Sequence, residues 1–215
     1  MSKKVTVIDY GMGNLFSVCR AIESQGGEPI ITADAQAILS AERLILPGVG
    51  AFENGMNELK QRNLVDPVRE FAKNGRPFLG ICLGMQMMLD VSEEFGNHEG
   101  LGLIPGKVSL ISKLSKNGGA MKVPHIGWNG LKPCPRGAPW KDSILNQVEV
   151  GASVYFVHSF AAFPKDPAHY LAAVDYGGHD ITAAIASRNI YGCQFHPERS
   201  GEIGLKIMQK FLALK

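Results

Sequence analysis

The stretch Gly80-Ile81-Cys82-Leu83-Gly84-Met85-Gln86 sets a cysteine between two glycines, at the point where an apolar segment gives way to a helical pattern. Residues 76–81 are typical of a buried strand, and residues 83–90 can begin a helix at once. The two glycines let neighbouring backbone approach a sharp turn. The amino end of the helix favours a negatively charged thiolate. The stretch therefore predicts a strand, a turn and a helix with Cys82 as nucleophile, although most cysteines in apolar runs are small core residues.

A second reactive segment is Gln194-Phe195-His196-Pro197-Glu198, in which His196 follows the apolar run 189–195. His196 falls where the expected strand ends, and Pro197 prevents that strand from continuing. Glu198 can then turn back toward the imidazole. A histidine base held by a carboxylate is the usual companion of a cysteine nucleophile. Alone, His196 would be interpreted as a surface histidine; beside the Cys82 motif, the pattern predicts a catalytic triad of Cys82, His196 and Glu198.

The first half of the chain alternates strands and helices. Strands are expected at 5–8, 28–32, 43–46 and 76–81, and helices at 15–25, 54–62 and 66–74. This alternation predicts an α/β fold with a flavodoxin-like open sheet, largely parallel in the first half, with helices on both faces. The second half is predicted to add short strands at about 107–111, 123–131, 153–158, 170–175, 181–186 and 190–195, before a final helix at about 200–213. No linker or repeat interrupts the chain, so residues 1–215 are expected to form a single domain.

Composition narrows the class of protein. Of the 215 residues, 45% are hydrophobic and 20% are charged, which is ordinary for a core-forming protein in water. A net charge of +2 with scattered Lys and Arg gives no reason to expect nucleic acid as a partner. No apolar run approaches the ~18 residues of a membrane span, and the start of the chain leads into a short strand, so no membrane and a cytoplasmic location are expected. The four cysteines are widely spaced and the histidines lack ligand spacing, so neither disulfides nor a metal site is expected.

The segment Pro47-Gly48-Val49-Gly50 is a third functional candidate, because it follows the third strand at the edge where Cys82 is also expected. Amide hydrolysis passes through an oxyanion, which needs donors worth ~3 kcal/mol each. One donor is expected to be the backbone N–H of Leu83, and the second the N–H of Val49 or Gly50. The alternative interpretation is a plain strand-to-helix turn, which glycine content alone would favour.

The Cys82 motif and His196-Pro197-Glu198 together resemble the class I, or triad, glutamine amidotransferase family. Two further segments, Asp9-Tyr10-Gly11-Met12-Gly13-Asn14 and Pro124-His125-Ile126-Gly127-Trp128-Asn129, are similar to those of one branch, the glutaminase subunits of imidazole glycerol phosphate synthases. The similarity runs over essentially all 215 residues, and the motifs keep the order they have in that family.

This resemblance implies a reaction and a partner. Cys82 would attack the side-chain amide of glutamine, a thioester would form as ammonia leaves, and water would release glutamate. Ammonia would pass to a cyclase subunit with a (β/α)₈ barrel, which makes imidazole glycerol phosphate and an aminoimidazole carboxamide ribonucleotide in histidine biosynthesis. The Pro47–Gly50 loop would hold an inactive peptide orientation until the partner is loaded. No metal or organic cofactor is implied.

The resemblance also implies roles for individual residues. Gly50, Gln86 and the backbone of Ser159 and Phe160 would bind glutamine; many relatives have tyrosine where this chain has Phe160, so a hydroxyl contact is not expected there. The partner-facing positions would be Asn14, Trp128, Tyr155 and Arg199, the last standing where lysine is commoner. His158 is the second candidate for the base and is expected to be structural instead.

Three alternatives remain open at the level of sequence. The glutaminase subunit of pyridoxal phosphate synthase has a similar cysteine turn and His-Pro-Glu segment, although residues 9–14 and 124–129 favour the histidine pathway. A non-catalytic regulatory or chaperone module on the same scaffold would be favoured by a missing histidine or glutamate, and neither is missing. A stand-alone thiol hydrolase is a weaker option, and a test for partner-dependent glutamine hydrolysis separates it from the others.

Overall fold

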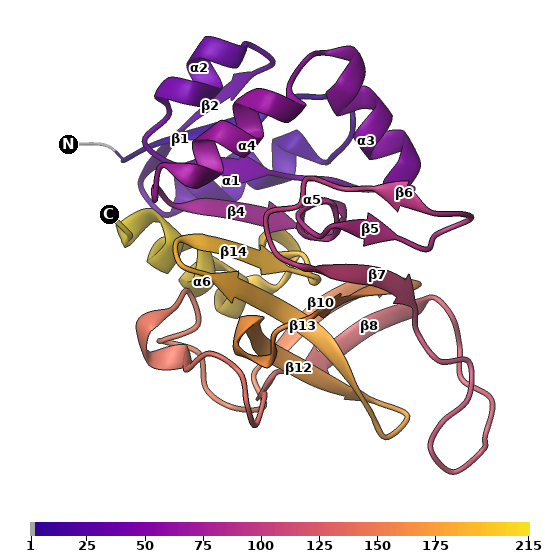
Figure 1. Ribbon diagram of the computed structural model, residues 1–215. Helices are drawn as coiled ribbons and strands as arrows, with labels where there is room; N and C mark the ends of the chain where they lie inside the picture. Colours follow the sequence, from indigo (N-terminus) through magenta and orange to yellow (C-terminus); the bar gives the residue numbers. More distant parts are fainter. Residues whose placement is uncertain (1–2) are drawn as a thin grey trace.

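Short runs rich in Val, Ile and Leu form the centre of an eight-stranded sheet in the computed structural model, which describes residues 3–215 (Figure 1). The strand order is β2-β1-β3-β4-β14-β13-β12-β9. The pairs from β2 to β14 are parallel, and those from β14 to β9 are antiparallel. The strands are β1 (Lys3–Ile8), β2 (Gly27–Thr32), β3 (Leu44–Leu46), β4 (Phe78–Ile81), β9 (Lys132–Pro133), β12 (Tyr170–Tyr176), β13 (His179–Ser187) and β14 (Ile190–Cys193). The predicted α/β fold with a largely parallel first half is confirmed.

Helices cover both faces of this sheet. Successive residues of a strand point to opposite faces, so Val7 packs in one core with α1 and α6, whereas Ile8 packs in another with α2, α3 and α4. The helices are α1 (Leu15–Ser24), α2 (Ala35–Ser40), α3 (Phe52–Gln61), α4 (Val65–Lys73), α5 (Leu83–Met87) and α6 (Gly201–Ala213), with single 3-10 turns at η1 (Trp140–Asp142), η2 (Pro167–His169) and η3 (Pro197–Arg199). No helix within residues 3–215 is both long enough and apolar enough to cross a bilayer.

Two smaller sheets accompany the large one. The first pairs β8 (His125–Gly130) with β10 (Ser153–His158) in antiparallel fashion, and sets Tyr155 opposite Trp128. The second has the order β11-β7-β5-β6. Its strands are β5 (Val91–Ser92), β6 (His98–Glu99), β7 (Gly106–Leu110) and β11 (Phe160–Pro164).

Several local predictions were wrong. The helix after Cys82 ends at Met87 rather than continuing to residue 90, because the N–H groups of Leu101 and Leu103 donate to the carbonyls of Met87 and Met88 (2.7 and 2.8 Å). Helix α2 was not predicted; Asp34 caps it by accepting from the N–H of Ala37. The strands β5, β6, β9 and β11 were also missed. Met1 and Ser2 lie outside the described residues.

Candidate active site

Three adjacent parallel strands bring the predicted reactive segments to one edge of the large sheet. Pro47 follows β3, Cys82 follows β4, and Gln194 follows β14. Figure 1 shows the gold β14 beside the purple β4, although more than a hundred residues separate them in sequence. Because these strands are parallel, their carboxyl ends open on the same side.

Cys82 occupies a strained turn between β4 and α5. Its backbone has φ 53° and ψ −108°, a region that non-glycine residues rarely adopt. Its N–H donates to the carbonyl of Cys193 (2.7 Å), which ties the turn to β14. A Cβ at Gly84 would overlap the carbonyl oxygen of Leu46, and one at Gly80 would lie 2.7 Å from the nitrogen of Met85. The turn therefore requires both glycines that the sequence places around Cys82.

His196 and Glu198 form a buried pair beside this turn. Nδ1 of His196 lies 2.8 Å from Oε1 of Glu198, and their side chains are 4% and 2% exposed. The carboxylate fixes the proton on Nδ1, while the buried Nε2 has no hydrogen-bond partner among the described residues. Burial lowers the pKa of His196, but Cys82 and Glu198 outweigh it and raise that pKa to about 10. Glu198 and Cys82 therefore stabilise the imidazolium that forms when His196 takes up a proton.

A cavity of about 340 Å³ joins Cys82 and His196 to the other predicted substrate residues. Glu198 lies behind His196 rather than on the cavity wall. The predicted residues on that wall, besides Cys82 and His196, are Val49, Gly50, Leu83, Gln86, Ser159 and Phe160. The structure thus gathers at one site segments that are far apart in the sequence.

Gln86 links the cavity to Cys82 through a buried hydrogen-bond network. Its Nε2 donates to the carbonyl of Phe160 and to Oε1 of Gln194, each at 3.0 Å. Gln194 Nε2 in turn lies 3.6 Å from Sγ of Cys82. Because both N–H groups of the Gln86 amide are used, only its carbonyl oxygen is available to a ligand. Gln194 belongs to the predicted His196 segment, but the sequence indicated no role for it.

The backbone N–H of Leu83, which was predicted to donate to the oxyanion, already donates a hydrogen bond within the protein. This N–H donates to the carbonyl oxygen of Gly48 at 3.3 Å. Gly50 has φ +110°, a left-handed conformation that favours glycine. The loop of residues 47–50 therefore turns a carbonyl toward the nucleophile turn, where an oxyanion would need a donor.

His158 and His125 form a second buried pair, and His158 lines the same cavity as Cys82. His158 Nδ1 lies 2.9 Å from the carbonyl of Phe160, and its Nε2 lies 3.2 Å from Nδ1 of His125. A carbonyl only accepts, so His158 donates through Nδ1 and accepts from His125. Burial, with the charges of His125 and His196, lowers the pKa of His158 to about 4. That His158 is structural rather than the base stays a prediction.

The other cysteines are in surroundings that oppose ionisation. Burial raises the pKa of Cys19 and of Cys193, and it raises the pKa of Cys134 to about 11. All four cysteines are free thiols. Within residues 3–215, no three His, Cys, Asp or Glu side chains gather in an arrangement that could hold a metal ion.

Two residues of the cavity wall, Glu94 and Phe95, were not predicted. Oε2 of Glu94 accepts from the N–H of Phe52 (2.7 Å) at the start of α3, and Phe95 is 88% exposed with its ring against Phe160. The sequence offered no periodic pattern over residues 91–99. The early end of α5 brings this segment back over the cavity, and that end depends on contacts with residues 100–104.

Three of the four predicted partner-facing residues form a surface cluster. Trp128 is 58% exposed, and its ring lies 6.0 Å from that of Tyr155. Arg199, which belongs to η3, also approaches Tyr155: its guanidinium lies 5.9 Å from the centre of the Tyr155 ring. Asn14 caps α1, where its side chain accepts from the N–H of Ser17.

Comparisons with known proteins agree with this geometry. Residues 6–214 match the family model described as glutamine amidotransferase class-I. The chain is 51% identical over 210 residues to imidazole glycerol phosphate synthase subunit HisH 1 of Legionella pneumophila strain Lens, covering 98% of this chain and 99% of that protein. It is 46% identical over 213 residues to the HisH subunit of Geobacter sulfurreducens, covering 99% of each. The structure of PurLQS from Thermotoga maritima shares the fold, with a TM-score of 0.73, 22% identity and 99% coverage of both chains.

Proposed function

Since this chain belongs to the class I glutamine amidotransferase family, we propose that it is the glutaminase subunit of an imidazole glycerol phosphate synthase in histidine biosynthesis. The observation that supports this proposal most strongly is that Cys82 and His196 line the same cavity, with His196 hydrogen-bonded to Glu198. Relatives 46–51% identical over almost the whole chain are named as this subunit. Those names favour the histidine pathway over the pyridoxal phosphate and non-catalytic alternatives.

In the proposed reaction, Cys82 attacks the side-chain carbonyl of glutamine. His196 takes the thiol proton and returns it to the departing amide nitrogen, so that ammonia leaves and a γ-glutamyl thioester remains. His196 then removes a proton from water, and the resulting attack releases glutamate and restores the thiol. Glu198 keeps the proton of His196 on Nδ1 and stabilises the imidazolium, which leaves Nε2 directed to the reacting atoms.

The walls of the cavity suggest how glutamine is held. We assign its amino-acid end to Gln86, to Gly50 and to the backbone of Ser159 and Phe160, all of which line the cavity. Glu94 adds a carboxylate to the same wall, and an α-ammonium is the group such a carboxylate would bind. One Glu94 oxygen already accepts from Phe52, which fixes the side chain in place.

The proposal includes control by the Pro47–Gly50 loop. As long as the Gly48 carbonyl accepts from Leu83, the oxyanion lacks its donor next to Cys82. Rotation of the peptide between Gly48 and Val49 would free the Leu83 N–H and turn the Val49 N–H toward the same point. A glutaminase governed in this way hydrolyses little glutamine until a partner favours the rotated loop.

Delivery of ammonia requires a partner, proposed to be a cyclase subunit with a (β/α)₈ barrel. The candidate docking face contains Trp128, Tyr155 and Arg199, with Asn14 at the same sheet edge. An exposed indole next to a tyrosine and an arginine has the composition of an interface hot spot.

One experiment tests the proposal directly. Glutamate release is measured for the chain alone, with the cyclase subunit, and with the cyclase plus its acceptor, the ribulosyl aminoimidazole carboxamide nucleotide. We expect rates that rise in that order, by about 100-fold or more overall, since a loop held out of place by a few kcal/mol slows turnover to that extent. Equal rates in all three conditions would favour a stand-alone hydrolase. Activation by a pyridoxal phosphate synthase subunit instead of the cyclase would indicate the other pathway.

A further inference from the structure

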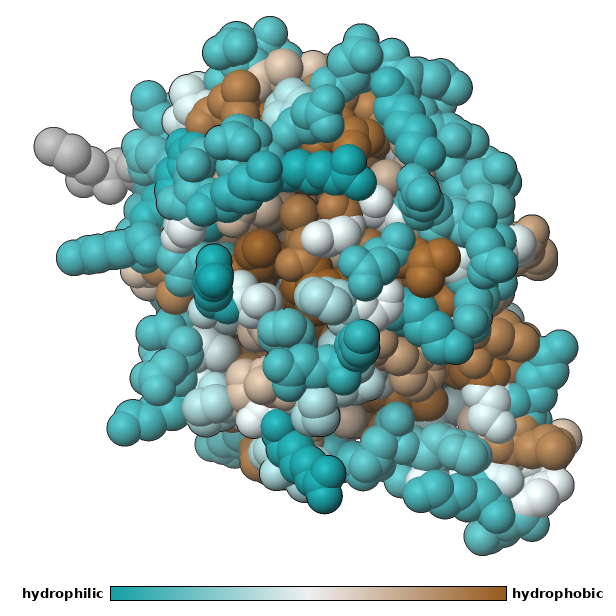
Figure 2. Space-filling model, viewed as in Figure 1, coloured by the Kyte–Doolittle hydropathy of each residue, from teal (hydrophilic) through white to brown (hydrophobic). Residues whose placement is uncertain are grey.

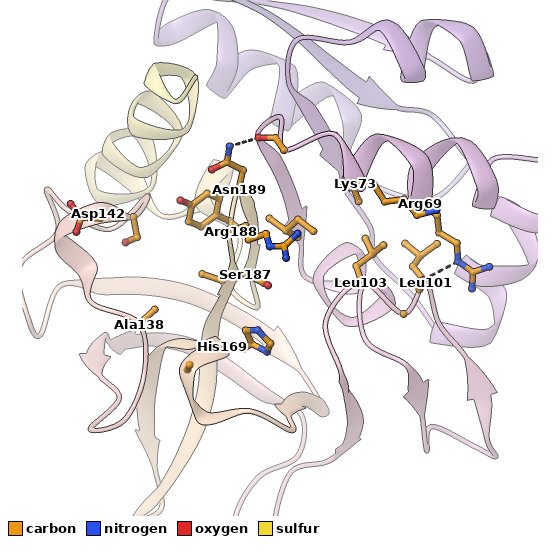
Figure 3. Close-up of a pocket in the computed structure, with 18 of the residues that line it drawn as sticks. Arg69, Lys73, Leu101, Leu103, Ala138, Asp142, His169, Ser187, Arg188 and Asn189 are labelled. Carbon is orange, nitrogen blue, oxygen red and sulfur yellow. Dashed lines mark hydrogen bonds between the residues drawn. The ribbon is translucent and has the colours of Figure 1, made fainter.

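A second cavity, of about 1010 Å³, lies at the opposite edge of the large sheet from Cys82. It is lined by residues that precede β4 and β14, such as Gly75 and Arg188, whereas Cys82 and His196 follow those strands. The two cavities share no lining residue. Figure 3 shows α4 and residues 101–103 on one side, Ala138 and Asp142 on the other, and the β13–β14 turn between them. The volume of this cavity is at the upper end of the range found for small-molecule binding sites.

The lining of this cavity carries more positive than negative charge. Arg69, Lys73 and Arg188 contribute cations, and Asp142 is the only acidic side chain among its lining residues. Arg69 is already engaged, since it donates to the carbonyls of residues 100 and 101 at 3.1 and 2.9 Å. Lys73 lies 3.6 Å from Glu70 in a mostly exposed ion pair, which contributes little. Two cations, Lys73 and Arg188, are therefore available to an anion.

Arg188 stands in the left-handed backbone conformation that a two-residue hairpin turn requires at its first central position. It has φ +54° in the two-residue turn between β13 and β14, where glycine or asparagine is favoured. Within residues 3–215, no side chain or carbonyl forms a hydrogen bond or ion pair with its guanidinium. Figure 3 shows this guanidinium reaching toward the middle of the pocket. Arginine is an unfavourable residue at such a position, and its unpartnered guanidinium is available to an anion.

The wall that carries Arg188 is fixed relative to the wall that carries Lys73. The side-chain amide of Asn189 donates to the carbonyl of Gly75, the dashed contact at the top of Figure 3, and so ties the β13–β14 turn to the end of α4. The two chain segments that carry the available cations are thus joined before any ligand arrives, while the side chains of Lys73 and Arg188 themselves are exposed.

Apolar and polar groups complete the cavity between these cations. Leu101, Leu103 and Ala138 contribute apolar surface, and Figure 2 shows brown surface between hydrophilic side chains in the middle of this face. Nδ1 of His169 is buried and has no hydrogen-bond partner among the described residues. A ligand that fits would combine an anionic group with a flat, partly apolar body carrying a hydrogen-bonding edge.

We propose that this cavity binds a small phosphate ester with a planar base-like body, of the class of the nucleoside monophosphates. The phosphate lies between Arg188 and Lys73, where a dianion matches two cations and the arginine can donate two parallel hydrogen bonds. The planar body packs on Leu101 and Leu103, and its polar edge reaches Nδ1 of His169. The site is independent of glutamine hydrolysis and stays open when a partner covers the Cys82 edge.

Calorimetric titration of the full chain tests the proposal, with AMP, adenosine and ribose 5-phosphate as probes. We expect AMP to bind, and the two partial probes to bind at least about tenfold more weakly, since each lacks half of the matched groups. Arg188→Gln should weaken AMP binding about tenfold or more. Arg20→Gln, which removes the same charge from an exposed position on α1, should leave it unchanged.

Arg188→Gly separates binding from folding. Glycine relieves the left-handed strain, so this variant should be at least as thermally stable as the parent and should still lose AMP affinity. Absence of AMP binding at millimolar concentration would overturn the proposal. So would adenosine or ribose 5-phosphate binding as tightly as AMP, or equal weakening by Arg188→Gln and Arg20→Gln.

Discussion

The phenol of Tyr10 donates a hydrogen bond to the carbonyl oxygen of Pro47, 2.7 Å away, in a fully buried position beneath the loop that follows β3. A Cβ on Gly48 would overlap the same phenol oxygen, so the ring and the loop are in close contact. Tyr10 thus restrains the peptide next to the one whose carbonyl accepts from Leu83. This tyrosine stabilises the orientation in which the donor beside Cys82 is occupied.

Tyr10→Phe should release this restraint. The lost hydrogen bond costs about 1–3 kcal/mol, because the Pro47 carbonyl is left buried without a donor. We expect a lower melting temperature and a several-fold faster release of glutamate by the chain without its cyclase. The fully activated rate should change less. An unchanged or slower basal rate in a folded variant would contradict the role given to Tyr10.

Replacing Cys82 distinguishes its chemical role from its structural role. Cys82→Ala and Cys82→Gly should both abolish glutamate release while leaving cyclase binding intact. Because φ is 53° at this position, Cys82→Gly should be more stable than Cys82→Ala by about 1 kcal/mol. Cys134→Ala serves as the control and should keep full activity. Residual hydrolysis in either Cys82 variant, measured by glutamate release and thermal melting, would exclude Cys82 as nucleophile.

The base and its orienting carboxylate should differ in the size of their effects. His196→Ala removes the group that moves protons, and it should reduce kcat to near the background rate. Glu198→Gln keeps a side chain of the same shape and should impair kcat by a smaller factor. Full activity in His196→Ala, together with loss in His158→Ala, would identify His158 as the base instead.

His158 should make folding stability depend on acid pH. Its pKa is about 4 in the folded chain and 6.5 when unperturbed, so the unfolded chain binds the proton more readily between these values. The free energy of unfolding should therefore fall as pH drops from about 6.5 to 4, by roughly 3 kcal/mol from this group. His125, whose pKa is also lowered by burial, adds in the same direction.

Denaturant titrations at several pH values measure this slope. His158→Gln removes the titrating group, so its slope below pH 6.5 should be flatter than that of the parent. His179→Gln replaces a histidine near the surface and should leave the slope unchanged. Parallel slopes for the parent and His158→Gln would show that His158 does not stay neutral in the folded chain.

The sequence predicted the elements whose signal is local. Apolar runs bounded by glycine and proline gave the central strands, and the glycines around Cys82 gave the turn that positions it. The prediction failed where distant segments decide the outcome. The end of α5 at Met87 depends on N–H groups of residues 101–104, and the two-residue strands β5 and β6 exist only because that segment folds back.

The same division applies to the site. Cys82, His196 and Glu198 stand in recognisable local motifs, so their meeting at one sheet edge could be foreseen. The donation from Gln86 to Phe160 and Gln194 joins residues 74 and 108 positions apart, and no local pattern specifies such a pair. The hydrogen bond from the N–H of Leu83 to the carbonyl of Gly48 likewise depends on the orientation of one peptide group. Glycine allows that peptide group to point in either direction.

The place of β14 in the sheet also sets the order of events during synthesis. This strand enters the chain last among the strands, yet it lies between β4 and β13 and pairs with both. Contacts between such distant segments form slowly. A ribosome-bound chain that ends before residue 190 therefore exposes an unpaired edge on β4, a site for aggregation or chaperone binding. It also lacks His196, so Cys82 acquires its proposed base only after this strand is inserted.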